Sequence, residues 1–364
     1  MTLSSKLADL AGLALRGLHA TYGATGGLPY TMQLRDGAFQ PEGHSVRYAL
    51  ISLLGLDVAE LVVGQTHNLS DTLWHRIADS GLIDTLNAGD YGLGLWAAAR
   101  YDRADTRFTA HRALTELRRD PSRCDSVDLA WLVLGAEHRL QSGGDEAEAT
   151  TLLTEAKQHL LNLWSPDASL FYRHPRGGAV SSVSRSVACF ANQIYPLMAL
   201  SAHAKRTGCD TSRDIVAKLT DNLCRLQGSL GQWWWLYDAK GGGVVDGYPV
   251  YSVHQDGMAL MGLLWAGNAL DRDLSEHLDR SLQWVYGPNE RNEKMIVVEP
   301  GLVLRDMHRV GVGRVQRMLE GTLHCCGKKT EWSSRRDEAA FCVNAECRPY
   351  HLGWVLYAAG LANR

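Results

Sequence analysis

The sequence lacks the features that mark several large classes of protein. Its net charge is only −3 over 364 residues, which gives no field strong enough to favour nucleic acid or an anionic membrane as a partner. No apolar run approaches the roughly 20 residues that a membrane span needs. The N-terminus has no basic leader, and Asp9 and Arg16 interrupt its apolar residues, so it predicts an amphipathic helix rather than an export signal. We therefore expect a cytoplasmic protein without a transmembrane segment.

Strand-like runs of Val and Ile are also scarce, which argues against a TIM barrel. Helical periodicity dominates instead, in two sets of segments. One set carries charges on one side, as helices with a solvent-facing stripe do, and covers about 4–22, 68–80, 106–119, 145–163, 212–228 and 272–285. The other set is apolar nearly all round, as buried helices are, and its members begin at His44, Gly89, Cys124, Ala191, His254 and Cys347.

The two sets alternate six times along the chain. This order resembles an (α/α)6 barrel, a ring of six inner helices inside six outer ones, and it implies an all-α fold in one domain over residues 1–364. Three connections from outer to inner helix carry strand-like aromatic runs, which predict β-hairpin insertions at the N-terminal face of the inner helices. A fourth insertion, about 287–346, is the longest, and we expect it to be functional. A superhelical stack of helix pairs is the nearest alternative.

Parallel inner helices would bring their six N-termini together at one mouth of the ring, where polar side chains are concentrated. A single Asp at a helix start is often only an N-cap, worth about 1 kcal/mol. A set that also includes His, Arg, Gln and Tyr instead predicts a small-molecule site. Its members are His44, Arg47, Asp90, Tyr91, Asp125, Asp128, Asn192, Gln193, Tyr195, His254, Gln255, Asp256, Glu346, Arg348 and His351.

Carboxylates around an aromatic-lined cavity are suited to cleavage of a glycosidic bond. One carboxylic acid protonates the leaving oxygen, and a second carboxylate activates water from the opposite face. We expect Asp256 and Asp90 to fill these roles, with Asp238 and Glu346 as the next candidates. The other polar residues of the first helical turns are then expected to bind the substrate.

Residues 231–267 contain the densest group of aromatic side chains in the chain. "WWWLYD" and "YPVYS" predict the two arms of one hairpin, and "HQDG" predicts the first turn of the fifth inner helix. Trp234, Trp235 and Tyr237 are candidate platforms for sugar rings. Because side chains alternate along a strand, Trp234 should face opposite to its two tryptophan neighbours, so at least one of the three should pack on the scaffold.

The same residues also permit proton transfer without hydrolysis. In β-elimination or epimerisation at a uronate, Tyr251, His254 and His351 would carry protons. Arg47 or Arg348 would then neutralise the carboxylate of the sugar. This leaves a uronate lyase or a sugar epimerase as the alternative to a hydrolase.

The resemblance to (α/α)6 barrels implies a carbohydrate-active enzyme. Barrels of this kind include inverting glycoside hydrolases, unsaturated-uronyl hydrolases, polysaccharide lyases and sugar epimerases, which implies a glycan or glycoconjugate substrate and no required cofactor. Similar toroids also serve isoprenoid cyclases, and the 11 tryptophans fit the stabilisation of carbocations, although no Asp-rich diphosphate motif is present. A barrel that binds a ligand without catalysis is the remaining alternative.

Four of the eight cysteines cluster near the C-terminus. In a cytoplasmic protein such a cluster favours a metal over disulfides, so Cys325, Cys326, Cys342 and Cys347 are candidate ligands of a zinc ion. The spacing C-C-x15-C-x4-C is not a standard zinc pattern. A structural clip for the long insertion is therefore favoured over a catalytic metal.

Overall fold

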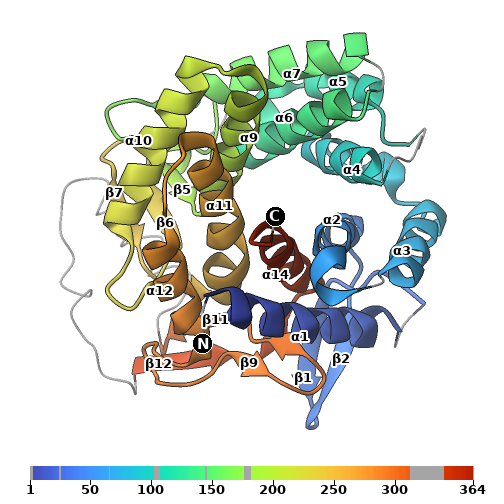
Figure 1. Ribbon diagram of the computed structural model, residues 1–364, viewed down its shortest axis with the longest axis vertical. Coiled ribbons are helices and arrows are strands. Elements are labelled where there is room, and N and C mark those ends of the chain that lie inside the picture. The colour runs from blue at the N-terminus through green and yellow to red at the C-terminus, as the bar shows by residue number, and fades with distance from the viewer. Residues whose placement is uncertain are drawn as a thin grey trace.

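The computed structural model describes residues 3–23, 26–64, 66–101, 107–143, 146–175, 182–311 and 340–363. In it twelve principal helices alternate between an outer and an inner layer (Figure 1). The outer helices are α1 (Leu3–Gly23), α3 (His67–Asp79), α5 (Ala110–Arg119), α7 (Glu146–Leu161), α10 (Asp210–Leu226) and α12 (Ser275–Tyr286). The inner helices are α2 (Val46–Val63), α4 (Ala88–Arg100), α6 (Ser126–Gln141), α9 (Ala191–Thr207), α11 (Ala259–Leu270) and α14 (Pro349–Leu361). Both predicted sets are confirmed.

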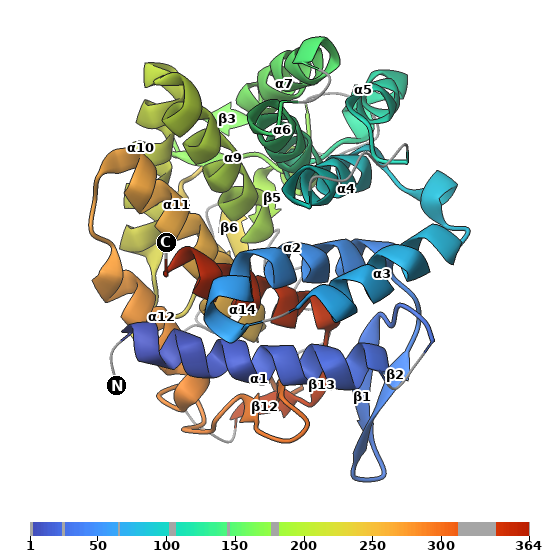
Figure 2. The ribbon, with the colours of Figure 1, turned by 45° about the vertical axis from the view of Figure 1, so that its right-hand side comes forward.

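The inner helices close into a ring, because the last of them, α14, packs against both α1 and α2 from the start of the chain (Figures 1 and 2). Glycine permits this approach. A Cβ added to Gly55 would lie 2.1 Å from the carbonyl oxygen of Gly353, so neither backbone leaves room for a side chain at the crossing. The closed ring rules out the superhelical stack and confirms the (α/α)6 barrel.

Aromatic side chains fill the centre of the ring. The Trp96 ring of α4 stacks on His138 of α6 at 5.3 Å between centroids and lies 6.1 Å from Trp354 of α14. Trp96 and Trp354 are both fully buried. Inner helices that are apolar on every side therefore pack on each other as well as on the outer layer, as their sequences predicted.

The connections form small antiparallel sheets that join distant segments. One sheet has the order β13 (Glu346–Cys347), β1 (Thr31–Arg35), β2 (Ala38–Glu42), and another has β5 (Val187–Cys189), β6 (Leu236–Asp238), β7 (Gly243–Asp246). A third has β12 (Phe341–Asn344), β11 (Asp306–Arg309), β8 (Val250–Tyr251). Two-stranded sheets pair β3 (Trp164–Ser165) with β4 (Leu170–Phe171), and β9 (Ile296–Val297) with β10 (Leu302–Val303). Short helices η1 (Ile83–Thr85), η2 (Pro121–Arg123) and α8 (Ser182–Ser186) complete the connections.

The predicted hairpin between "WWWLYD" and "YPVYS" is wrong. Strand β6 pairs with β7 and β5, whereas β8 pairs with β11 of the long insertion. Partner choice in a sheet depends on long-range packing, which local alternation does not encode. Residues 312–339 of that insertion lie outside the described residues. Among the helices that the structure describes, none is both long and apolar enough to cross a membrane.

Candidate active site

The first turn of α4 carries a carboxylate with two functions. Asn87 caps the helix by accepting a hydrogen bond from the Asp90 backbone N–H at 2.8 Å, and Asp90 Oδ2 accepts one from the Asn87 N–H at 3.3 Å. Arg47 of α2 also donates to both oxygens of Asp90, from Nε at 2.5 Å and from Nη2 at 3.1 Å. Asn87, and not Asp90, is therefore the N-cap of α4, whereas Asp90 is the third residue of this capping box and also half of an ion pair between neighbouring inner helices.

The next inner helix, α6, begins with the same motif. Asp125 is its cap and accepts from the Asp128 N–H at 3.1 Å, while Asp128 Oδ2 accepts from the Asp125 N–H at 3.2 Å. The two motifs touch, because Asn87 Nδ2 donates to Asp128 Oδ1 at 3.2 Å. A Cβ on Gly89 would lie 2.2 Å from Asp128 Oδ1, so this approach of α4 to α6 requires glycine.

The two carboxylates at the third helical positions have opposite electrostatic environments. Burial, followed by the negative charge of Asp125, raises the pKa of Asp128 from 3.8 to about 7, although Arg47 opposes the shift. Asp90 instead has the Arg47 guanidinium on both oxygens. Neighbouring acids in such different surroundings are typical of acid–base sites. From the sequence alone, Asp128 was expected only to bind substrate.

Three tyrosines and one arginine, from the start of β1 and from the first turns of α2 and α14, lie beside this group. Tyr30 stacks on Tyr48 at 5.0 Å, and Tyr48 lies 4.5 Å from Tyr350. The Arg348 guanidinium lies 4.3 Å from the Tyr30 ring and donates to the Tyr48 hydroxyl at 2.9 Å. None of the three tyrosines was predicted, although Tyr48 follows Arg47 directly and Tyr350 directly precedes His351.

Glu346, a candidate acid, is instead a fixed carboxylate. Arg305 Nη1 donates to it at 2.7 Å, and Arg348 Nε donates to the same oxygen. Burial alone would raise the pKa of Glu346, but the Arg348 hydrogen bond and the two positive charges hold that pKa below its usual value. Its chemistry is to position two arginines, not to deliver a proton.

His254 lies in the short π-helix η3 (His254–Met258) that precedes α11. Its imidazole packs against Phe190 at 4.9 Å, Tyr251 at 5.2 Å and Trp235 at 6.1 Å. Burial lowers the pKa of His254 to about 3, so the ring is neutral near pH 7 and is a weak base. Its assignment as a proton carrier is not supported by this environment.

The three tryptophans divide between scaffold and site, but not by the predicted alternation, because the run precedes β6 and is not part of a strand. Trp233 Nε1 donates to Ser281 Oγ of α12 at 2.7 Å, and Trp234 Nε1 donates to the Leu226 carbonyl of α10 at 2.8 Å. Trp235 instead packs on Tyr251, with 4.8 Å between ring centroids. Trp235 is therefore the tryptophan of this run that lies beside the site.

Asp256, the first choice as a catalytic acid, is fully buried in the scaffold. Its Oδ1 lies 2.6 Å from Nε2 of His351, which is itself 3 % exposed. The pair joins η3 to α14 inside the ring. Because neither side chain is open to a substrate, we correct their assignment from catalysis and binding to helix packing.

Several other predicted site residues have a structural role, because they bond to or pack on neighbouring parts of the fold. Gln255 accepts from the Trp233 N–H at 3.0 Å, and Gln193 exchanges hydrogen bonds with both backbone groups of Phe171 at 2.8 and 2.9 Å. Asp238 accepts from the Lys240 N–H in the turn between β6 and β7. The remaining residues of this kind, each bonded to or packed on the scaffold, are Tyr91, Asn192, Tyr195 and Tyr237. His44 is exposed in the loop before α2.

The described cysteines give the zinc site no support. Cys325 and Cys326 lie outside the described residues, and Cys342 and Cys347 belong to different sheets. Cys347 is fully buried, whereas Cys342 Sγ lies 2.9 Å from His308 Nε2. No group of three His, Cys, Asp or Glu side chains within the described ranges is arranged to hold a metal ion.

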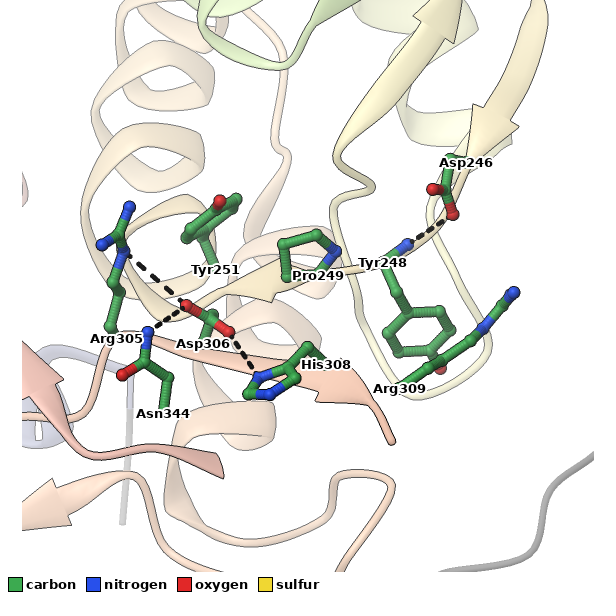
Figure 3. A pocket seen from close by; sticks show the side chains of 9 residues that line it. All are labelled: Asp246, Tyr248, Pro249, Tyr251, Arg305, Asp306, His308, Arg309 and Asn344. Atoms are coloured by element: carbon green, nitrogen blue, oxygen red, sulfur yellow. Dashed lines mark hydrogen bonds and ion pairs between the residues drawn. The ribbon is translucent and has the colours of Figure 1, made fainter. Parts of the chain in front are cut away.

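A cavity of about 270 Å³ adjoins the site (Figure 3). Its wall comes from the segment around β8 and from β11 and β12, with Asp246, Tyr248, Pro249, Tyr251, Arg305, Asp306, His308, Arg309 and Asn344 as its lining residues. Arg305 connects the cavity to Glu346 and Arg348, because it donates to Glu346 and its guanidinium lies 5.5 Å from the centroid of the Tyr251 ring. Tyr251 is the one lining residue that was predicted from the sequence. The alternation in "DMHR" and "FCVN" was the available signal.

No family model and no curated protein matches the sequence. Solved structures do match the fold. An unsaturated glucuronyl hydrolase from Streptococcus agalactiae has a TM-score of 0.61 at 12 % identity, covering 99 % of this chain and 92 % of that one. A sugar epimerase from a ruminal bacterium has a TM-score of 0.65 at 10 % sequence identity, and the match covers 100 % of both chains. The GH76A alpha-1,6-mannanase of Salegentibacter sp. HEL1_6 has a TM-score of 0.62 at 12 % sequence identity, and the match covers 98 % of this chain and 99 % of that one. The chain therefore has the (α/α)6-barrel fold of these carbohydrate-active enzymes.

Proposed function

We propose that this protein is a carbohydrate-active enzyme that hydrolyses a glycosidic bond, with Asp128 as the proton donor. The observation that carries the proposal is the contrast between Asp128, whose pKa is raised to about 7, and the neighbouring Asp90, which is paired with Arg47. A protonated carboxyl group near neutral pH is what departure of a sugar oxygen requires. The shared fold of two glycan hydrolases and a sugar epimerase supports the same substrate class.

The proposed reaction uses Asp128 twice. Its proton passes to the glycosidic oxygen as the bond to the anomeric carbon breaks. The carboxylate that remains accepts a proton from the water that adds to that carbon. Asp90 positions Arg47 through both oxygens, and its negative charge contributes to the raised pKa of Asp128.

The environment of the histidines favours hydrolysis over the alternatives. Of the three residues expected to carry protons in a uronate lyase or epimerase, His254 and His351 are buried, and the pKa of His254 is lowered to about 3. Tyr251 is the one of the three that lines the cavity. An isoprenoid cyclase would need rings rather than ion pairs around the reacting carbon. Here Arg47, Asp90 and Asp128 occupy the helix starts.

The decisive experiment compares Asp128→Asn with the wild type on α-1,6-mannan fragments and on disaccharides that end in an unsaturated uronate, with products followed by mass spectrometry. We expect cleavage of one of these sugar classes and its loss, by about 100-fold or more, in the variant. Asp84→Asn is the matched control, because Asp84 is an exposed partner of Arg112. Full activity in Asp128→Asn would refute the assignment. Sugar binding without cleavage in either protein would indicate a binding barrel.

A further inference from the structure

The sheet of β8, β11 and β12 has one buried face and one polar face. Val250 and Met307 are fully buried beneath it. Side chains alternate along each strand, and in this register His308 lies opposite Cys342, while Asp306 lies between Asn344 and Tyr251. The polar face therefore carries Tyr251, Asp306, His308, Cys342 and Asn344.

Three of these side chains form a hydrogen-bonded relay. Cys342 Sγ lies 2.9 Å from His308 Nε2, and His308 Nδ1 lies 3.0 Å from Asp306 Oδ1. Asn344 Nδ2 donates to the other oxygen of Asp306 at 3.0 Å and fixes the carboxylate. Because a carboxylate only accepts, it selects the tautomer with hydrogen on Nδ1 and leaves Nε2 to accept the thiol proton.

The same geometry excludes a metal ion bound by Cys342 and Asp306 together. The sulfur and the carboxylate lie at opposite edges of one imidazole ring, so the two cannot bind a single ion together. A thiol, an imidazole that accepts its proton and a carboxylate that orients the imidazole are the parts of an activated nucleophile.

The relay faces open space rather than the core. Asp306 and His308 line the cavity of about 270 Å³, and the His308 side chain is 38 % exposed (Figure 3). Cys342 is also only partly buried, in contrast to the structural Cys347, which is fully buried. Cys342 is not itself a lining residue and adjoins the cavity through His308. A thiol that served packing alone would need no oriented imidazole.

We propose that Cys342 is the nucleophile of a second catalytic centre, which hydrolyses carboxylic esters carried on sugar hydroxyls. The sugar part of this substrate rests on the proposed function, because Arg305 and Tyr251 connect the cavity with the site at the helix starts. The ester part rests on the relay alone. A small acyl group suits a cavity of about 270 Å³.

The proposed reaction proceeds through a thioester. The Cys342 proton passes to His308 Nε2 while sulfur attacks the ester carbonyl carbon. The tetrahedral adduct then expels the sugar oxygen, which takes that proton and leaves as the hydroxyl. Water next attacks the thioester carbonyl and gives one proton to His308, the carbon–sulfur bond breaks, and the proton returns to sulfur. One ester and one water thus yield one hydroxyl group and one carboxylic acid.

The test uses the full chain with p-nitrophenyl acetate, which carries an acyl group but no sugar. We expect release of nitrophenol and an acetyl group on the peptide that contains Cys342, detected by mass spectrometry after acid quench. Cys342→Ser should abolish the adduct, and His308→Gln should slow its formation by about 100-fold. Cys209→Ser is the control, because Cys209 is a partly exposed thiol at the start of α10 whose pKa is lowered by hydrogen bonds from Ser212.

Two results would overturn the proposal. One is an acetylation rate at Cys342 that His308→Gln leaves unchanged. The other is a stoichiometric zinc ion in the purified protein that protects Cys342 from acetylation until it is removed. Because the probe lacks a sugar and Asp128→Asn is expected to react normally with it, failure of the glycosidase proposal would not hide the outcome. Acetylated oligosaccharides then test the sugar part separately.

Discussion

Asn87 at the start of α4 holds Asp128 at the start of α6, because its Nδ2 donates to Asp128 Oδ1 at 3.2 Å. The Asn87 side-chain oxygen meanwhile caps its own helix at Asp90. One amide thus couples the ion-paired carboxylate of one inner helix to the raised-pKa carboxylate of the next.

The pH dependence of glycan cleavage should follow protonation of Asp128. Its pKa is raised to about 7, so the acid form is abundant below that pH and declines above it. We expect kcat/KM to fall about tenfold per pH unit on the alkaline side. Steady-state kinetics between pH 5 and 9 on the cleaved substrate measures this limb. A rate that is constant to pH 9 would exclude Asp128 as the acid.

The same shift predicts how stability depends on pH. The folded state holds the Asp128 proton more tightly than the unfolded chain does, because the pKa of this carboxyl group is near 3.8 when the chain is unfolded. Its stabilising contribution is therefore complete below about pH 4 and is lost as pH rises through about 7. The asparagine side chain does not ionise, so Asp128→Asn removes this loss. The free energy of unfolding of the variant minus that of the wild type should therefore be larger at pH 8 than at pH 5. Urea unfolding at both pH values measures the difference, and an equal difference at both would contradict the shift.

Gly89→Ala should disrupt the contact between α4 and α6. The new Cβ would lie 2.2 Å from Asp128 Oδ1 and 2.7 Å from its Cα, so backbone must move. We expect a loss of about 1–3 kcal/mol in the free energy of unfolding, together with reduced activity. Gly12→Ala in α1 is the matched control, since a Cβ there meets nothing within 4 Å and should stabilise the helix.

Asp256→Ala should lower stability and spare the chemistry. The substitution leaves His351 Nε2 without its partner at 2.6 Å in a buried site, which costs about 1–3 kcal/mol. Thermal unfolding should detect that loss, while kcat of the folded fraction on the cleaved glycan stays within about twofold of the wild type. A large fall in kcat with unchanged stability would return Asp256 to the catalytic machinery.

Trp235→Ala and Trp234→Ala should separate binding from stability. Trp235 packs on Tyr251 and His254 beside the site, so its loss should raise KM. Trp234 donates to the Leu226 carbonyl of an outer helix, so its loss should lower the melting temperature and leave KM near the wild-type value. Equal effects of the two substitutions on KM would contradict this division.

The sequence by itself determined the order of the twelve helices and their division into two layers. Charge stripes and apolar surfaces repeat every few residues, so they are local properties that survive without knowledge of neighbours. The signal that starts an inner helix can also be local, as the repeated capping boxes at Asn87 and Asp125 illustrate. Convergence of Arg47, Asp90 and Asp128 followed from that order once the helices were taken as parallel.

Only the tertiary structure decided which of these residues are available for chemistry. Asp90, Asp128 and Asp256 all occupy first turns, but ion pairing, burial and a histidine partner give them three different environments. The relay of Asp306, His308 and Cys342 was equally hidden, because strand pairing brings together residues separated by 34 positions. Local sequence sets periodicity and caps, whereas pKa values and partners depend on what distant segments place within a few ångströms.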